Sequence, residues 1–542
     1  MAWLGWLLAL SQGRQNTIYK IDVKTGLYDG VHRNMKQRHI QMIALAGTLG
    51  TGLFLGSGKA IAIAGPAGAL LAFIHVGTVS YCMLMSLGEM MCYMPITGGY
   101  IHFAERFLDP AMGFALGWLQ WYSGVVGLPT EIIGATLIIG FWEPNGSGLP
   151  KAQLAGYITL LIVLCAAVNF LGVRWFGESE FIFAIIKILL VLGCIIGGLV
   201  IDLGAGPVHD RIGFRYWKNP GAFTPFITAG NTGKFLGWFE VLLQVTYSYV
   251  GMEGLAMAAA EVQNPRRALG KAVKRVFYRI LTFYVFGILV VGMLVPYNDT
   301  RLLQSTGTAA DSPFVLAMKR AGIKGLPSVV NAGVLSSAFS AGNAGLYQTS
   351  RQLYGLALRG QGPRIFAKTT KNGLPIVALS FSTIWMLLAY MALSKGSATV
   401  LTWLTNLVAI LGFCTWGIIS LTYIRFYHGL KHHKIDRTKF TFWNRFQPFP
   451  AYWALMWSII IILFNGWLVF LKGHWVTTDF IIAYINIPIF VALYAAYKIF
   501  CNSKISTVET MDFYSNVPSP AAVDIDEPVP RTVLGTISNW LF

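Results

Sequence analysis

Apolar runs of about twenty residues recur along the whole sequence, and this feature constrains the fold more than any other. A helix needs about 20 mostly apolar residues to cross the hydrocarbon core of a bilayer. Such runs occupy residues 40–62, 67–93, 112–141, 153–171, 180–201, 235–259, 277–296, 327–348, 374–394, 398–424, 451–471 and 478–499. The runs are continuous, whereas strands of a membrane barrel would alternate apolar and polar residues. The sequence therefore predicts an all-α membrane protein with about twelve transmembrane helices.

The composition agrees with a membrane protein and excludes a soluble one. Hydrophobic residues make up 55% of the chain, charged residues only 12%, and the mean hydropathy is +0.58. The six cysteines form no CxxC pair, and five of them fall within the apolar runs. We therefore expect them to be small apolar residues rather than a disulfide framework or metal ligands, and we expect no metal or cofactor.

The net charge of +18 is placed as in a membrane protein rather than a nucleic-acid binder. Lys and Arg cluster before the first run and after the sixth, eighth and tenth runs, at 14–38, 266–275, 351–371 and 425–445. These segments share one side if twelve spans alternate, which is the positive-inside pattern of cytoplasmic loops. We therefore expect a cytoplasmic tail at 1–39, a membrane domain at 40–500 and a cytoplasmic tail at 501–542. The polar composition after Ser503 predicts that the second tail is disordered.

Two of the predicted spans contain glycines that should interrupt a helix. The first span carries "LAGTLGTGLFLGSG" at 45–58, and the sixth carries "QVTYSYVGMEG" at 244–254. Each glycine costs an interior helix about 0.8–1 kcal/mol relative to alanine. Glycine-interrupted spans at matching positions in two halves are typical of inverted-repeat transporters. The spacing therefore predicts an inverted-repeat transporter in which helices one and six are broken.

Broken helices at membrane depth are tolerated where their free backbone groups line a cavity or meet a ligand. The N-terminus of a half-helix suits a carboxylate, and unwound carbonyls suit an ammonium group. Together they fit a zwitterion such as an amino acid. The alternative is close helix packing, because Gly52 and Gly56 also form a GxxxG motif.

At these residues the chain resembles the fungal amino acid permeases of the amino acid–polyamine–organocation superfamily. The resemblance covers about 35–500 and rests on "RHIQMIALAGTLGTGLFLGSGKAI", "SLGEMMCYMPITGGYIHFAERFLDPAMGFALGW", "AAAEVQNPRRALGKAVKRVFYRI" and "SAGNAGLYQTSRQLYGLALRGQGPRIFAKTTKNGLP". It implies a fold of five plus five inverted-repeat helices with two extra helices. It also implies proton-coupled import of L-amino acids at the plasma membrane. The stretch at 302–332 also resembles the branch that contains dicarboxylic amino-acid permeases. The cytoplasmic tails are candidate contacts for trafficking or ubiquitination machinery.

The resemblance also implies a substrate site. The substrate carboxylate would meet backbone N–H groups at Thr51 and Gly52, and the ammonium group would meet carbonyls near Thr48, Tyr247 and Val250. The full set expected at the substrate is Thr48, Gly50, Thr51, Gly52, Tyr247, Ser248 and Val250. Tyr247 matches the family's aromatic gate. Tyr249 is either a second gate residue or ordinary core packing.

Ionisable residues within membrane spans are costly and are functional candidates by default. We expect proton coupling at Lys187, Glu131 or Glu253. Lys187 has no charged neighbour within six residues, so it is either the proton carrier or a permanently paired lysine. Glu89, near the end of the second span, is better explained as a structural ion pair.

Three other functions are weaker alternatives. A channel would need a filter of carbonyls or charged rings, and no such sequence is present. A nutrient-sensing receptor with little net transport has no distinguishing sequence feature. An enzyme is not expected, because the chain has no HExxH pair and no nucleophile elbow.

Overall fold

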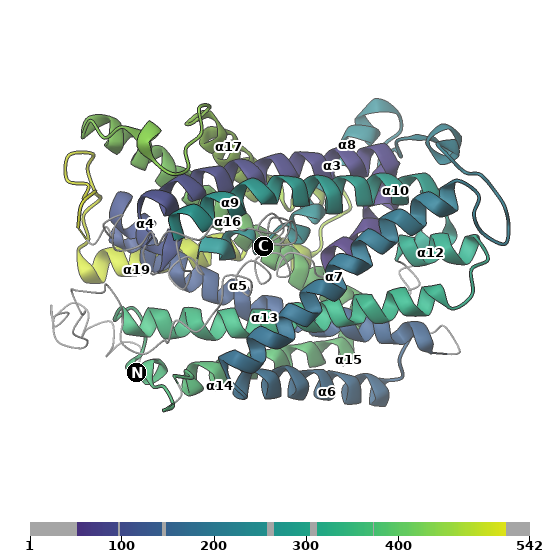
Figure 1. Cartoon of the computed structure of the whole chain (residues 1–542), viewed down its shortest axis with the longest axis horizontal. Helices are drawn as coiled ribbons and strands as arrows, with labels where there is room; N and C mark the ends of the chain where they lie inside the picture. Colours follow the sequence, from purple (N-terminus) through teal and green to yellow (C-terminus); the bar gives the residue numbers. More distant parts are fainter. Residues whose placement is uncertain are drawn as a thin grey trace, which may run out of the picture.

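The computed structural model describes residues 51–95, 98–143, 148–256, 265–303, 312–371 and 373–515, and these are helical without any β-strand. The main helices are α3 (Thr51–Tyr93), α4 (Gly99–Phe107), α5 (Pro110–Ile139), α6 (Lys151–Phe170), α7 (Val173–Asp202), α8 (Gly230–Val245), α9 (Pro265–Arg279), α10 (Gly287–Leu294), α12 (Pro313–Arg320), α13 (Leu326–Leu358), α14 (Ile376–Ile384), α15 (Ala392–Lys395), α16 (Ser397–His432), α17 (Phe449–Phe464), α18 (Thr477–Tyr484) and α19 (Asn486–Cys501). The long helices lie roughly along the longest axis of the molecule, and α7 crosses α13 obliquely (Figure 1).

Seven described helical segments are long and apolar enough to cross a membrane, or eight if the bent α18–α19 pair counts as one span. The seven are Gly52–Tyr93, Pro110–Trp142, Lys151–Phe170, Trp175–Asp202, Leu269–Leu294, Ile376–Lys395 and Ser397–His432. The described part of every apolar run expected from the sequence is mostly helical. The prediction of an all-α membrane fold is confirmed, and the exact number of spans stays a prediction.

The first two predicted spans are joined in α3, which bends at Gly65 and Pro66. Gly65 has φ +75°, a conformation that glycine adopts without steric cost. The backbone of residues 222–224 lies against this bend: Ala67 N donates to Ala222 O at 2.9 Å and Thr224 N donates to Ala64 O at 3.1 Å. The bend therefore separates a half-helix at 51–64 from a full-length helix that ends at Tyr93.

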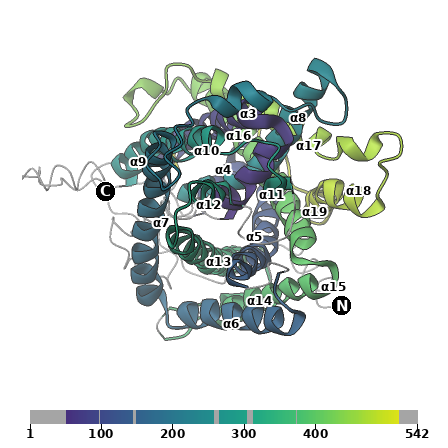
Figure 2. The ribbon, with the colours of Figure 1, turned by 90° about the vertical axis from the view of Figure 1, so that its right-hand side faces the viewer.

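The helices that contact the centre of the molecule are α3, α5, α13 and α16. In the end-on view of Figure 2, α6 lies at the lower edge and α7 at the left, while α5 and α13 lie towards the middle. α13 is a 33-residue helix rich in serine, asparagine and glutamine, so it falls below the hydropathy of the seven segments above. Its buried face packs along α5, where Gly124 lets the two backbones approach: a Cβ at Gly124 would meet Thr349 Oγ1 at 2.2 Å.

Three of the loops that carry the basic clusters gather at one end of the bundle. Cys92 Sγ donates to Arg266 O at 3.3 Å, Arg359 Nη1 lies 3.6 Å from Glu105 Oε1, and Arg437 Nε donates to Glu89 Oε1 at 2.7 Å. Each of these contacts is made to the end of α3 or to α4. The basic segments at 266–275, 351–371 and 425–445 therefore share one side, as the alternation of spans predicts.

The start of the C-terminal tail is packed rather than disordered. Residues 503–515 run across α3, α4 and α16: Tyr93 Oη donates to Phe513 O at 3.0 Å, and Ser506 N donates to Leu108 O at 2.9 Å. The side chains of Met511 and Phe513 are buried, and Phe513 stacks on Phe107 with 5.2 Å between ring centroids. The expectation of disorder after Ser503 is wrong for 503–515, because the apolar side chains of Met511 and Phe513 are buried. Residues 516–542 lie outside the described part of the chain.

Candidate functional site

The sixth predicted span is interrupted at the residues that the sequence indicates. α8 ends at Val245 and is followed by a 3-10 turn, η3 (Thr246–Ser248), and a second one, η4 (Met252–Ala256). Between them Gly251 has φ +99°, where a side chain would be strained. The carboxylate of Glu253 accepts a hydrogen bond from Gly251 N at 3.2 Å, so it satisfies one backbone group that the break leaves free.

The break predicted for the first span at 45–58 is not seen in its described part, because 51–58 form continuous helix at the start of α3 and 45–50 lie outside the described residues. The described start of α3 lies directly against the break after α8. α3 begins at Thr51 in the described residues, and Gly52 follows. A Cβ at Gly52 would meet Ser248 Oγ at 2.8 Å, Ser248 Cα at 3.0 Å and Tyr247 Cδ1 at 3.1 Å. Gly52 therefore allows the start of α3 to touch η3. By contrast, a Cβ at Gly56 would meet no atom of the described residues within 4 Å.

A central cavity of about 140 Å³ opens between the interrupted segment after α8 and the first described turn of α3. It is lined by α3, α5, α13, α16 and the interrupted segment after α8. The lining residues are Gly52, Gln120, Ser123, Gly124, Gly127, Leu128, Glu131, Tyr247, Ser248, Val250, Gly251, Glu253, Ala341, Gly342, Gly345, Gln348, Thr349, Gln352 and Val408. Four predicted substrate residues (Gly52, Tyr247, Ser248 and Val250) and two predicted coupling residues (Glu131 and Glu253) are thus brought together.

Two carboxylates in the cavity wall are held by aromatic donors. Tyr247 Oη donates to Glu131 Oε1 at 2.7 Å, which links η3 to α5. Trp416 Nε1 donates to Glu253 Oε2 at 3.0 Å, which links η4 to α16. Glu253 Oε1 is buried and has no hydrogen-bond partner among the described residues. An unsatisfied buried carboxylate oxygen is costly, so this atom is suited to a cation, an ammonium group or a proton.

Tyr249 lies outside the central cavity. Its side chain is fully buried, its hydroxyl donates to Phe73 O at 2.8 Å, and its ring stacks on Tyr284 with 4.4 Å between centroids. Of the two readings left open for this residue, its contacts fit core packing. The 3-10 turn directs Tyr247 and Tyr249 to different sides although they are two residues apart.

Lys187 also lies outside the cavity lining, and it is completely buried on α7. It interacts electrostatically with Glu180 on its own helix and with Glu131 on α5. Glu180, which the sequence analysis did not select, is buried between α7 and α13. It could have been found from its spacing, because residues seven apart lie on the same face of a helix, two turns from each other.

Three predicted positions receive little or no structural description. Thr48 and Gly50 lie outside the described residues, and only the backbone of Thr51 is described. Their proposed contacts to substrate remain predictions.

Glu89 forms a structural ion pair, the explanation that the sequence favours. Arg437 donates to both carboxylate oxygens of Glu89, from Nε at 2.7 Å and from Nη2 at 3.3 Å. This pair fixes the end of α3 to the loop after α16. Because Glu89 is buried, loss of its partner would leave an uncompensated charge.

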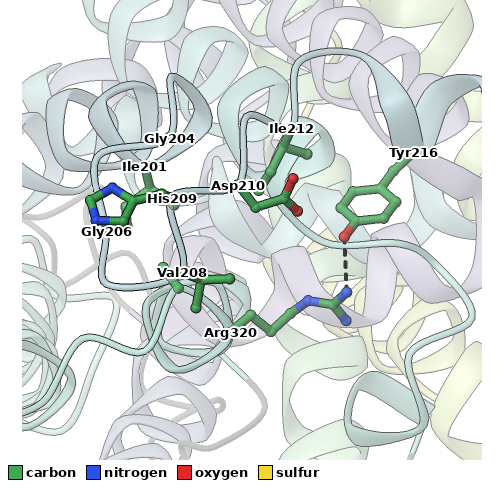
Figure 3. A pocket seen from close by; sticks show the side chains of 10 residues that line it. Ile201, Gly204, Gly206, Val208, His209, Asp210, Ile212, Tyr216 and Arg320 are labelled. Carbon is green, nitrogen blue, oxygen red and sulfur yellow. Dashed lines mark hydrogen bonds between the residues drawn. The ribbon is translucent and has the colours of Figure 1, made fainter.

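A second, smaller hollow of about 80 Å³ lies at the far end of α7 (Figure 3). It is lined by Ile201, Gly204, Gly206, Val208, His209, Asp210, Ile212, Tyr216, Arg320 and Ala321. Its charges are neutralised within the chain: Asp210 Oδ1 lies 2.7 Å from Arg215 Nη2, and Arg320 Nη1 lies 2.6 Å from Asp299 Oδ2. Arg320 Nη2 also donates to Tyr216 Oη at 2.9 Å, the contact drawn in Figure 3. The central cavity, with its unsatisfied carboxylate oxygen, is therefore the better candidate site.

Long apolar helices around a polar cavity at a helix break define a multi-pass membrane protein of the permease class. The model of the family described as "Amino acid permease" matches residues 39–509. The chain belongs to the amino acid permease family, which confirms the resemblance seen in the sequence and indicates amino acid transport.

Curated relatives cover most of the chain. It is 40% identical over 521 residues to the proline-specific permease of Emericella nidulans, with 94% of this chain and 93% of the relative covered. It is 39% identical over 490 residues to the dicarboxylic amino acid permease of Saccharomyces cerevisiae, covering 90% and 80%. It is 38% identical over 471 residues to the basic amino-acid permease of the same yeast, covering 86% and 81%. These relatives share the family but not the substrate that their names state.

Among solved structures, the chain is similar to a Na⁺-coupled sialic acid symporter in a substrate-bound outward-open state. The TM-score is 0.45 at 12% identity, and the alignment covers 84% of this chain and 95% of that one. This likeness is too low to carry an argument.

Proposed function

We propose that this protein is a secondary active transporter that imports L-amino acids by proton symport and alternating access. The proposed fold has twelve spans, ten of them in a five-plus-five inverted repeat with spans one and six broken. The proposed location is the plasma membrane, with both termini in the cytoplasm and tails that contact trafficking or ubiquitination machinery.

The observation that supports the proposal is the cavity between the interrupted segment after α8 and the first described turn of α3. The first backbone N–H groups of a helix have no intrahelical partner and carry partial positive charge. If the first span is broken before Thr51, as we propose, the N–H groups of Thr51 and Gly52 suit a substrate carboxylate, and Thr48, Gly50 and Ser248 belong to the same proposed site. The substrate ammonium group would meet acceptors of the interrupted segment after α8, which include the backbone carbonyls of Tyr247 and Val250 in the proposed site. A carboxylate site and an ammonium site together fit the two charged groups that all α-amino acids share.

The cavity favours neutral and basic side chains over acidic ones. Its described lining residues include two carboxylates and three glutamines but no lysine, arginine or histidine. The charge of a second carboxylate would therefore be buried without a cation beside it, which is costly. We propose a general L-amino-acid substrate range in which dicarboxylic amino acids are poor competitors.

The side facing the cytoplasm follows from the basic clusters. Three of the loops that carry them meet at the end of the bundle formed by Tyr93 and α4. Positively charged loops stay in the cytoplasm during insertion. This supports a cytoplasmic location of that end and of the packed tail segment 503–515.

Proton coupling is proposed at Glu131, Lys187 and Glu253. Glu131 and Glu253 line the cavity and can exchange protons with water that enters it. Lys187 interacts with Glu131 from behind the cavity wall. A gate at Tyr247 would bring its ring over the occupied site, while Tyr249, fully buried, would support that turn from the core.

Counterflow in proteoliposomes separates this function from its alternatives. Vesicles loaded with one unlabelled amino acid would take up the same labelled amino acid, and each of the twenty would be added in turn as a competitor. A carrier exchanges with saturation, a channel equilibrates without counterflow, and a nutrient receptor moves nothing. Absence of counterflow with every amino acid would contradict the proposal.

A further inference from the structure

The central cavity has two ends, and the pairing of α5 with α13 determines which residues meet at each. A Cβ at Gly342 on α13 would lie 3.6 Å from Glu131 Cβ on α5. A Cβ at Gly124 on α5 would lie 2.2 Å from Thr349 Oγ1 on α13. Residue numbers rise along α13 as they fall along α5, so the two helices are antiparallel. The lining residues after Thr349 therefore lie beside those before Gly124, away from Glu131.

Three glutamines and a glutamate lie at this second end of the cavity. The lining contains Gln120 on α5, and it contains Gln348 and Gln352 on α13. Gln348 and Gln352 are four residues apart, so they are neighbours on one face of the helix. A Cβ at Gly254 would lie 3.7 Å from Gln348 Oε1, which places Gln348 beside the segment that carries the lining residue Glu253. We call Gln120, Gln348, Gln352 and Glu253 the glutamine end of the cavity.

The glutamine end contains two buried acceptor atoms that the described residues leave unpaired. Trp416 Nε1 donates to Glu253 at 3.0 Å and Gly251 N donates at 3.2 Å, and both bonds go to Oε2. Glu253 Oε1 and Gln352 Oε1 have no hydrogen-bond partner among the described residues. The two side chains belong to residues that are 1% and 8% exposed, so bulk water does not satisfy these atoms. A ligand that brings hydrogen-bond donors would satisfy them.

The chemistry of the glutamine end favours one class of ligand group. A carboxamide both donates and accepts, whereas an ionised carboxylate only accepts. The four side chains therefore offer more acceptors than donors, which suits a group that carries N–H donors. An apolar group of the same size would leave the acceptors unpaired, and a site built for hydrogen bonds discriminates against such analogues.

We propose that the glutamine end binds the substrate side chain and selects amino acids whose side chains carry N–H donors, namely a carboxamide, an ammonium or a guanidinium group. Gln348 and Gln352 are the specificity-determining residues. They lie on α13, whereas the groups that all amino acids share are proposed to bind at α3 and at the interrupted segment after α8. This inference rests on the proposed function and narrows its general L-amino-acid range to a preferred class.

Two pairs of competitors of similar length test this preference in the wild type. Glutamine differs from methionine, and lysine from norleucine, chiefly in the end group of the side chain. Each would compete in proteoliposomes against a labelled amino acid that shows counterflow. We expect the donor-bearing member of at least one pair to compete about tenfold better than its apolar partner. A preference for glutamine alone identifies a carboxamide ligand, and a preference for lysine alone identifies a cationic one. Equal competition within both pairs overturns the inference.

The double variant Gln348→Met with Gln352→Met tests the two glutamines directly. It removes two amide groups and keeps unbranched side chains of similar length. The preference within the responsive pair should fall towards equality, while methionine and norleucine compete at least as well as in the wild type. Gln153→Met is the matched control, because Gln153 is exposed at the start of α6 and does not line the cavity. It should keep the wild-type ratio. A wild-type ratio in the double variant also overturns the inference.

The apolar competitors separate a changed side-chain site from a damaged transporter. A variant that still exchanges methionine but no longer prefers the donor-bearing partner has lost selectivity and kept transport. If the double variant does not reach the membrane, the two single variants are compared with the control, and the wild-type competition decides without any variant. Failure of this inference leaves counterflow in the wild type intact, whereas failure of the proposed function would abolish counterflow with every amino acid.

Discussion

The hydroxyl group of Tyr247 donates a hydrogen bond of 2.7 Å to Glu131, and this contact joins the broken span after α8 to α5 across the central cavity. Its geometry places an aromatic gate candidate and a proton-coupling candidate in one unit. Closing the ring of Tyr247 over a substrate would require this bond to break or move. Substrate binding and the charge of Glu131 are therefore expected to influence each other.

Tyr247→Phe should test this link without removing the ring. The change deletes the hydrogen bond to Glu131. A hydrogen bond to a charged group contributes about 1.5–3 kcal/mol. We expect proton-driven uptake to change its pH dependence, with half-maximal uptake at a higher pH, because the ionised carboxylate loses a stabilising donor. Tyr247→Ala should in addition weaken the apparent affinity for substrate. The link is refuted if Tyr247→Phe has the pH profile and affinity of the wild type.

Gly52→Ala should impair transport severely, by about tenfold or more. Its Cβ would lie 2.8 Å from Ser248 Oγ and 3.0 Å from the backbone Cα of Ser248, so the start of α3 would have to separate from η3. Gly56→Ala is the matched control, because no atom in the described part of the chain lies within 4 Å of the added Cβ. Initial uptake rates should be compared at equal amounts of protein in the membrane. Equal rates in the two variants would show that contact at Gly52 is not needed for transport.

Phe513→Ala should release the packed start of the C-terminal tail. The fully buried Phe513 ring packs on α4 and α16, and truncation of a buried Phe typically costs about 3–5 kcal/mol. Limited proteolysis of purified protein should then cleave within 503–515 much faster than in the wild type. Tyr514→Ala is the control, because that neighbouring ring is 69% exposed. Cleavage at the same rate in both variants would mean that the segment is not held by Phe513.

The packing of this tail segment should withstand mild acid. Partial burial opposes ionisation of Asp512, but the N–H groups of Ser515 and Tyr514 and the Arg106 guanidinium hold the pKa of Asp512 below its usual range. A lowered pKa in the folded state means that the stabilisation is complete above the ordinary pKa of about 3.9 and is lost only as the pH falls further. Protease protection of 503–515, probed by brief acid exposure, should therefore be constant from pH 7 to pH 5 and weaken only below about pH 4. A loss of protection between pH 7 and pH 5 would contradict this assignment.

The sequence predicts the helical class and the break after α8 because both depend on local chemistry. Gly251 adopts the positive φ that a break at this place requires, and Glu253 caps the free backbone beside it. The sequence predicts Tyr247 as the gate but leaves Tyr249 open, since the environment of Tyr249 arises from helices distant in the chain. Tyr249 meets Phe73 and Tyr284, which no local pattern links to it.

Two further features depend on tertiary contacts that composition does not report. Glu180 was overlooked because charges were sought within six residues of Lys187, whereas its partners are Ser340 and Asn343 on α13. The tail after Ser503 is polar on average, yet Met511 and Phe513 occupy a pocket between α4 and α16. In both cases the contacts of a few side chains determine the local structure, and the average composition of the segment does not predict it.

The most direct test of proton symport is uphill accumulation of an amino acid driven by protons alone. Purified protein in proteoliposomes would receive labelled amino acid, chosen from the counterflow panel, with the outside more acidic than the inside. We expect the wild type to concentrate the amino acid above the outside level and a protonophore to collapse this gradient. We also expect that Glu131→Gln does not respond to the proton gradient while exchange remains detectable. Counterflow without any response of the wild type to the proton gradient would contradict proton symport.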